Sequence, residues 1–158
     1  MRRSMKASIV SLVATGAVLV MSAPGFTQGA EVTSGDFQVF ATGVGNTAYD
    51  NVSGRAQMVR TAEGKTIVKV NVSGLAANTA YLAHVHTLAC GTNAANGHYR
   101  FDPAGPANST NELWPGFTTD SDGSGSGKAV SPMTAGSTAV SVVIHTAAGA
   151  KILCADLA

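Results

Sequence analysis

The sequence predicts an all-β domain, folded as an antiparallel sandwich or barrel with one long irregular segment. The chain has 158 residues, which suits a single domain. After its N-terminal segment it shows almost no helical periodicity and is rich in glycine, threonine, valine, alanine, serine and asparagine. Its apolar runs are short and alternate with turn residues, as in sandwiches and barrels built from many short strands.

The expected strands follow in chain order. Residues Phe37–Phe40 are rich in strand-forming side chains. Arg55–Thr61 and Thr66–Val72 flank a short turn around Gly64, and this arrangement predicts a hairpin. The remaining expected strands are Tyr81–His86, Val140–His145 and Lys151–Cys154.

The segment from Cys90 to Lys128 differs from the rest, because it is long and rich in glycine, asparagine, proline, serine and aspartate. A compact domain rarely contains so long an irregular segment unless the segment binds something or is disordered. It also contains one of the few histidines of the chain, so we expect it to contribute to a functional site.

Residues 1–30 are typical of a secretory signal peptide. Arg2, Arg3 and Lys6 form a basic start, and Ala7–Met21 is an apolar run of suitable length. A retained N-terminal membrane segment is the alternative, but the run is short for a membrane span. We expect cleavage between residues 25 and 30, which leaves 31–158 as one domain, exported to a periplasm or secreted.

The charge balance of the mature chain excludes a basic nucleic-acid-binding surface. The whole chain has ten basic and nine acidic residues. Three basic residues lie in the predicted signal peptide and every acidic residue lies after it, so seven basic residues face nine acidic ones and the net charge is −2. We therefore expect no nucleic-acid partner. No second long apolar run follows, so we expect no membrane contact by the mature chain.

Export bears on the two cysteines, Cys90 and Cys154, because disulfides persist in oxidising compartments. Two cysteines in a small exported domain most simply pair with each other. In the chain-entropy model, closing a loop of about 65 residues stabilises the fold by at most on the order of 4 kcal/mol. The alternative, a copper site with thiolate ligands, fits an oxidising compartment less well.

The four histidines are His84, His86, His98 and His145. The first two are separated by one residue in an expected strand, so both imidazoles face the same side. Imidazole suits copper and zinc, and nitrogen ligands without thiolate let copper change its oxidation state. Taken singly, each has an ordinary alternative: a surface pair, a solvated loop side chain or a structural residue at a strand end.

Six short motifs occur in order between about Ser53 and Leu157. They are Val72-Ser73-Gly74-Leu75 ahead of His84-Val85-His86, Cys90, Gly97-His98-Tyr99 with Asp102-Pro103, Phe117-Thr118-Thr119-Asp120-Ser121-Asp122-Gly123, Val142-Val143-Ile144-His145, and Lys151-Ile152-Leu153-Cys154. Together they resemble the copper–zinc superoxide dismutases. The resemblance implies an eight-stranded antiparallel Greek-key β-barrel with a long metal-site loop. It also implies a disulfide between Cys90 and Cys154.

The same resemblance implies that His84, His86, His98 and His145 hold one copper ion per chain. Two features of the family are missing. The chain has no further histidines between His98 and the Asp120-to-Gly123 turn, where the family has two zinc ligands, so we expect no zinc. Only residues 146–153 separate the last histidine from Cys154, where the family has a long charged loop. Both absences are typical of the copper-only branch.

Three further residues are assigned roles next to the copper site. Glu112 lies near the position of the family's zinc-binding aspartate, and we expect it to accept a hydrogen bond from His98, because metal-bound imidazoles normally donate their other N–H to a partner. A surface glutamate is the alternative. Lys151 replaces a family arginine and would attract the superoxide anion, a task to which Arg100 would add.

The sequence therefore predicts a superoxide dismutase that converts superoxide to dioxygen and hydrogen peroxide, with His98, Glu112 and Lys151 as its catalytic residues. The competing hypothesis is a non-catalytic copper-binding module, a buffer or chaperone, on the same barrel. A metal-free structural barrel is a third reading, which the complete set of four histidines disfavours.

Overall fold

The computed structural model describes residues 29–40 and 47–158. The predicted signal peptide, residues 1–30, lies outside this part of the chain except for its last two positions. The described residues form nine strands and two short 3₁₀ helices, η2 (Thr47–Tyr49) and η3 (Asn93–Ala95). Among these residues no helix has the length and apolar character needed to cross a membrane.

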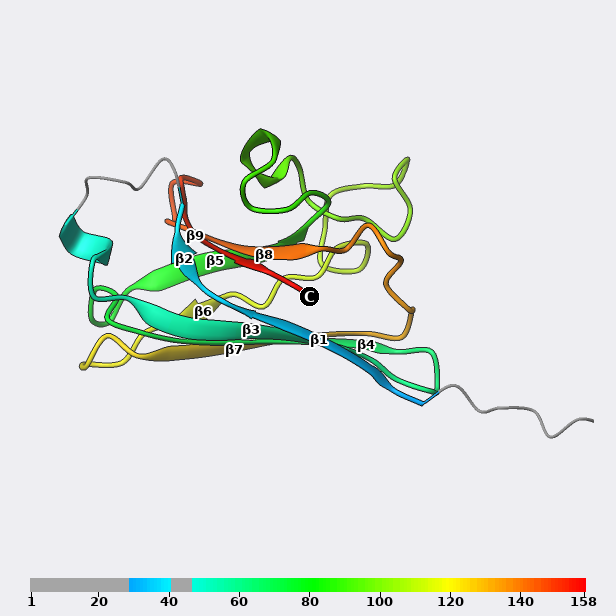
Figure 1. The fold of residues 1–158 in the computed structure, drawn as a ribbon, viewed down its shortest axis with the longest axis horizontal. Helices are drawn as coiled ribbons and strands as arrows, with labels where there is room; N and C mark the ends of the chain where they lie inside the picture. Colours follow the sequence, from blue (N-terminus) through cyan, green and yellow to red (C-terminus); the bar gives the residue numbers. More distant parts are fainter. Residues whose placement is uncertain (1–28, 41–46) are drawn as a thin grey trace, which may run out of the picture.

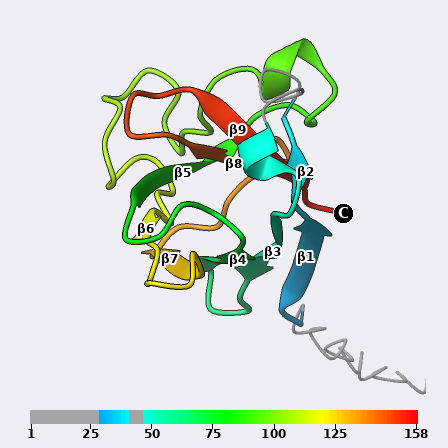
Figure 2. The ribbon, with the colours of Figure 1, turned by 90° about the vertical axis from the view of Figure 1, so that its left-hand side faces the viewer.

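The strands form two antiparallel sheets, which lie as two layers (Figures 1 and 2). In spatial order, the four-stranded sheet consists of β1 (Glu31–Asp36), β3 (Ser53–Arg60), β4 (Thr66–Ser73) and β7 (Gly125–Ser131). The five-stranded sheet consists of β2 (Gln38–Val39), β9 (Lys151–Asp156), β8 (Ser141–His145), β5 (Ala80–His86) and β6 (Phe117–Thr118).

The main core lies between the two sheets. Alternate residues of β4, Val68, Val70 and Val72, are buried against Val142 and Ile144 of β8 in one apolar cluster. The intervening residues of β8 face the other side of the five-stranded sheet. They are buried as well, because the segment between β5 and β6 passes over that side, where Figure 1 shows it next to β8 and β5.

A second, smaller cluster holds this segment in place. It joins Val143 of β8 to Phe40, Ala95 and Cys154, with Cys90 packed against it. The Cys90–Cys154 disulfide, which the sequence predicted, lies in this cluster and ties the loop to β9. The four-residue cluster and the disulfide thus hold this segment against the outer side of the five-stranded sheet.

Instead of the expected eight-stranded barrel, the described residues form nine strands in two sheets. The extra strand arises because the N-terminal run bends at Phe37, so that β1 pairs with β3 while β2 pairs with β9. The sheets approach each other at β1 and β9 without a strand ladder between them, and a side chain at Gly35 would clash with the main-chain oxygen of Asp156. No ladder closes the described residues into a barrel.

The strands expected from the sequence are present, with small shifts at their ends, and the β3–β4 hairpin turns at Gly64, whose φ is 80°. Three strands were missed: β1, β6 and β7. β1 (EVTSGD) and β7 (GSGKAVS) contain few strand-forming side chains, and their pairing with β3 and β4 places them in the sheet. The irregular segment is correspondingly shorter than expected, because β6 and the start of β7 lie within it.

Candidate metal centre

The fold brings His84, His86, His98 and His145 together. One ring nitrogen from each lies within 4.8 Å of those of the others, and three of the four residues are buried. Within the described ranges, this is the one group of three or more histidine, cysteine or acidic side chains that could hold a metal ion. The four ligand candidates of the sequence therefore share one site, and metal binding by them remains a prediction.

Strand geometry places three of these histidines. His84 and His86 flank Val85, which points into the main core, so both imidazoles lie on the outer side of the five-stranded sheet. His145 ends the neighbouring strand β8, where a bulge follows Ile144. His98 comes from the covering loop and forms an isolated β-bridge with His86.

Three of the rings use Nδ1 in a hydrogen bond with a protein oxygen. The pairs are His86 with Asn96 O at 3.1 Å, His145 with Gly149 O at 3.2 Å, and His98 with Glu112 Oε2 at 2.8 Å. A main-chain oxygen or an ionised carboxylate can only accept, so each Nδ1 donates its proton and each Nε2 keeps a lone pair. The Nε2 atoms of His86 and His145 face each other at 3.3 Å.

His84 is the exception. Its Nδ1 is buried and has no hydrogen-bond partner, a situation that is rare for a polar atom inside a protein. Its ring stacks on that of His98, with centroids 3.9 Å apart. A metal ion would satisfy the buried Nδ1 and also separate the facing lone pairs of His86 and His145. The donor set thus fits a metal bound by one Nδ1 and three Nε2 atoms.

The electrostatics favour the neutral, ligating form of these rings. Burial, with the neighbouring histidines, lowers the pKa of His84 and of His86 to about 3. Burial likewise lowers the pKa of His145. Metal ligation requires unprotonated imidazole nitrogen, so these rings are ready to bind at neutral pH. No thiolate is available to the site, because both cysteines are in the disulfide.

Glu112 lies behind His98 and is 2% exposed. Its Oε2 accepts hydrogen bonds from His98 and from Trp114 Nε1, the latter at 2.7 Å, and its Oε1 accepts one from Arg100 Nε at 3.0 Å. Burial raises the pKa of this carboxyl, but the bonds from Trp114, His98 and Arg100 outweigh burial and leave the pKa below its usual value. Glu112 is therefore an ionised, buried group in contact with His98 and not a surface glutamate.

The sequence matches no protein-family model and no curated protein. The structure, in contrast, is similar to that of a glutamate-to-glutamine mutant of superoxide dismutase 5 from Candida albicans. The TM-score is 0.53 at 16% sequence identity, and the match covers 82% of this chain and 92% of that one. The chain has a superoxide dismutase-like fold.

Two cations of this superoxide dismutase-like domain make contacts that the sequence did not predict. Lys151 Nζ donates to the main-chain oxygens of Ala94 and Asn96, at 2.5 and 2.8 Å, so its ammonium group holds the covering loop. Arg100 pairs with Glu112, which offsets its charge. Trp114, which was missed, is the one tryptophan of the chain. No sequence pattern singled it out, and only its proximity to Glu112 along the chain could have done so.

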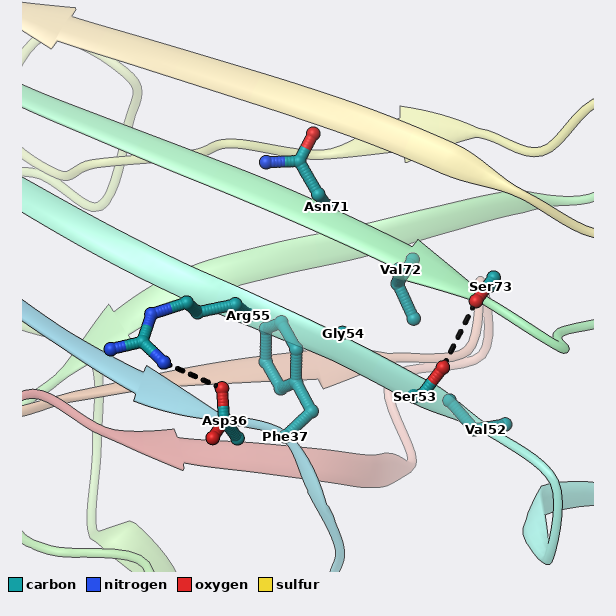
Figure 3. Close-up of a pocket in the computed structure, with 9 residues that line it drawn as sticks. All are labelled: Asp36, Phe37, Val52, Ser53, Gly54, Arg55, Asn71, Val72 and Ser73. Atoms are coloured by element: carbon teal, nitrogen blue, oxygen red, sulfur yellow. Dashed lines mark hydrogen bonds and ion pairs between the residues drawn. The ribbon is translucent and has the colours of Figure 1, made fainter.

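A separate hollow of about 580 Å³ lies on the four-stranded sheet, where β1 and β4 end and β3 begins (Figure 3). Phe37 and Val72 contribute apolar surface to it, and the Asp36–Arg55 ion pair, 2.9 Å long, lies beside them. None of the four histidines lines this hollow. None of the residues that line it belongs to the group that could hold a metal ion, and its ion pair is exposed.

Proposed function

We propose that this protein is a copper-dependent superoxide dismutase of the copper-only type, exported from the cell, which converts superoxide to dioxygen and hydrogen peroxide. The observation that supports it most is the cluster of four imidazoles with a buried, unpartnered Nδ1 on His84. The superoxide dismutase-like fold adds to it. The predicted signal peptide and the disulfide support export.

The choice of copper rather than zinc follows from the four imidazole donors and from the electron transfer that superoxide dismutation requires. Bound copper would supply one-electron redox chemistry, which zinc lacks, and imidazoles suit both of its oxidation states. His84, His86, His98 and His145 would hold one copper ion. The proposal includes no zinc, because His98 contacts a glutamate at the position where a bridging histidine of the family meets a second metal.

The protein residues would divide the remaining tasks. His84, His86 and His145 lie on paired strands, which fixes the positions of their rings. His98 lies on the covering loop and its side chain is 32% exposed, so of the four histidines it is the one that water reaches most readily. Glu112 would keep the proton of His98 on Nδ1, which leaves Nε2 to hold the metal or, when it is not bound to the metal, to carry a proton.

The second candidate, a copper buffer or chaperone, is favoured by one observation. The cation expected to attract superoxide, Lys151, donates to two main-chain oxygens, and Arg100 is paired with a carboxylate. A steady-state superoxide assay on copper-loaded protein lacking residues 1–30 separates the two. Catalysis well above that of an equal amount of His98→Ala protein supports the dismutase. Equal rates in the two proteins, with copper bound to both, would show a copper-binding module.

A further inference from the structure

Glu112 is held by three donors, and two of them compete for its orientation. Arg100 donates through Nε to Oε1 and through Nη1 to Gly105 O at 3.4 Å. Trp114 donates to Oε2, the oxygen that also accepts from His98. The carboxylate therefore has Arg100 at one oxygen, and Trp114 together with His98 at the other.

An arginine beside a carboxylate tends to form a bidentate pair, in which both oxygens accept from the planar guanidinium. Rotation of Glu112 into such a pair would move Oε2 away from His98. The hydrogen bond from the indole opposes this rotation, because the buried charge of Glu112 would lose one of its donors. Charge-assisted bonds of this kind are stronger than neutral ones.

Trp114 also lies close to the histidine cluster. Its ring meets the ring of His84 edge-on, with centroids 5.6 Å apart, while the residue is 42% exposed. Burial alone therefore does not explain its presence. The indole N–H contacts Glu112 while the ring edge contacts His84, so the side chain joins the carboxylate to the site.

We propose that Trp114 is a positioning residue for the metal centre: its indole N–H keeps Glu112 Oε2 on His98 and prevents the carboxylate from rotating into a bidentate pair with Arg100. The proposal rests on the copper site of the proposed function but not on superoxide turnover. Without the indole N–H, His98 loses its fixed acceptor, and its proton is shared between Nδ1 and Nε2.

The experiment compares the parent with Trp114→Phe, which keeps an aromatic ring and removes the N–H. Ring-nitrogen NMR shifts of the metal-free proteins at neutral pH report which nitrogen of His98 is protonated, and chelator competition reports copper(II) affinity. In the parent we expect the single proton of neutral His98 to be on Nδ1. In the variant we expect a mixture of the two neutral tautomers, with the proton on Nδ1 in some molecules and on Nε2 in others. Copper affinity should fall about 10-fold, the lower end of the effect of losing a partner of a metal ligand.

Two double variants test the mechanism. Trp114→Phe with Arg100→Lys should recover much of the His98 signature, because lysine keeps the charge but cannot form the bidentate fork. Trp114→Phe should add nothing in a Glu112→Gln background, because the two residues act as one unit. Arg55→Lys, at an exposed ion pair on the other sheet, is the matched control and should change nothing.

Parent-like His98 protonation and copper affinity in Trp114→Phe would overturn the proposal. Full additivity of the effects of Trp114→Phe and Glu112→Gln would also overturn it, because Trp114 would then act through its contact with His84 and not through Glu112. Neither measurement uses superoxide. A protein that binds copper as described but does not dismutate superoxide would therefore refute the proposed function and leave this inference standing.

Discussion

Lys151 Nζ lies 2.8 Å from the main-chain oxygen of Asn96, the same oxygen that accepts from His86 Nδ1 at 3.1 Å. The loop that presents this oxygen is strained, because four consecutive non-glycine residues, 93–96, have φ between 44° and 57°. Each such residue costs on the order of 1 kcal/mol or more. The ammonium group binds two carbonyls of this turn, so Lys151 stabilises the acceptor that orients His86.

Replacing Lys151 should therefore affect metal binding as well as substrate attraction. We expect Lys151→Gln to lower copper(II) affinity several-fold, towards the roughly 10-fold typical of losing a partner behind a metal ligand, and Lys151→Arg to restore part of it. Chelator competition measures this, with Lys69→Gln on an exposed position of β4 as the control. If Lys151 only attracts superoxide, Lys151→Gln will keep parental copper affinity and lose activity in a salt-dependent manner.

The metal content should be one copper and no stoichiometric zinc per mature chain. The expectation follows from four imidazoles that form one site and from the position of Glu112 beside His98. Metal analysis after equal exposure to both ions and removal of the excess measures it. His84→Ala removes the buried Nδ1 and should release most of the copper. A zinc ion held tightly alongside copper would contradict the copper-only assignment.

Reduction of the Cys90–Cys154 disulfide should destabilise the fold and loosen the metal site. The bond closes a loop with a sequence separation of 64, which is worth at most about 4 kcal/mol in the chain-entropy model. It also anchors the loop that presents His98. Thermal melting with and without a reductant, with and without copper, measures both effects. An unchanged melting temperature with both thiols free would show that the sheets and the small apolar cluster suffice.

Much of this site could be predicted because its chemistry is concentrated in rare residue types. Four histidines and two cysteines account for the whole cluster and the disulfide, and the alternation of His84 and His86 in a strand places both rings on one side. The hydrogen bond from His98 to Glu112 was predicted because a metal-bound imidazole needs an acceptor for its other N–H. These inferences needed only local strand geometry and the resemblance.

The rest depends on tertiary contacts that no local pattern encodes. The N-terminal run divides at Phe37 into two strands, because β1 pairs with β3 in one sheet and β2 pairs with β9 in the other. In the same way, β7 is a strand because it pairs with β4. Lys151 was expected to be a cation near the copper site, but its hydrogen bonds to two carbonyls of the turn at 93–96 were not predicted. Such a turn, built without glycine, has no sequence signature.

The metal-free protein should lose stability as the pH falls from about 6.5 towards 3. Unfolded histidines take up protons near pH 6.5, whereas the pKa of folded His84 and His86 is about 3 because of burial. Between these values the unfolded state binds more protons, so stability rises with pH, by at most about 2.7 kcal/mol per pH unit for two groups. Below pH 4.5 protonation of Glu112, whose pKa is lowered, acts in the same direction.

Denaturant unfolding of the metal-free protein at a series of pH values measures this dependence. His84→Gln and His86→Gln should each flatten the profile between pH 6 and 4, because each removes one group that takes up a proton on unfolding. A parent profile that is already flat over this range would show that the rings are protonated in the folded state and that burial is less complete than the structure indicates.

Glu112→Gln should lower dismutase activity more than copper occupancy. Three of the proposed copper ligands, on β5 and β8, are not among the hydrogen-bond partners of Glu112, so the ion should remain bound. The amide oxygen can still accept from His98 Nδ1 and Trp114 Nε1, but it lacks the charge that favours this proton. The NH₂ group, in the place of Oε1, cannot accept the hydrogen bond from Arg100 Nε. Losses of a partner behind a metal ligand are about 10- to 100-fold in affinity or activity, and we expect most of the loss in activity.

Steady-state superoxide assays and copper analysis across neutral pH measure the two effects separately. In a His98→Ala background, Glu112→Gln should cause no further loss of activity, because the two residues act through one hydrogen bond. Glu63→Gln, at an exposed turn, is the matched control for the loss of a carboxylate. Parental activity of Glu112→Gln at every pH would mean that the charge of this buried carboxylate has no part in the function of His98, and that its three hydrogen bonds serve the fold alone.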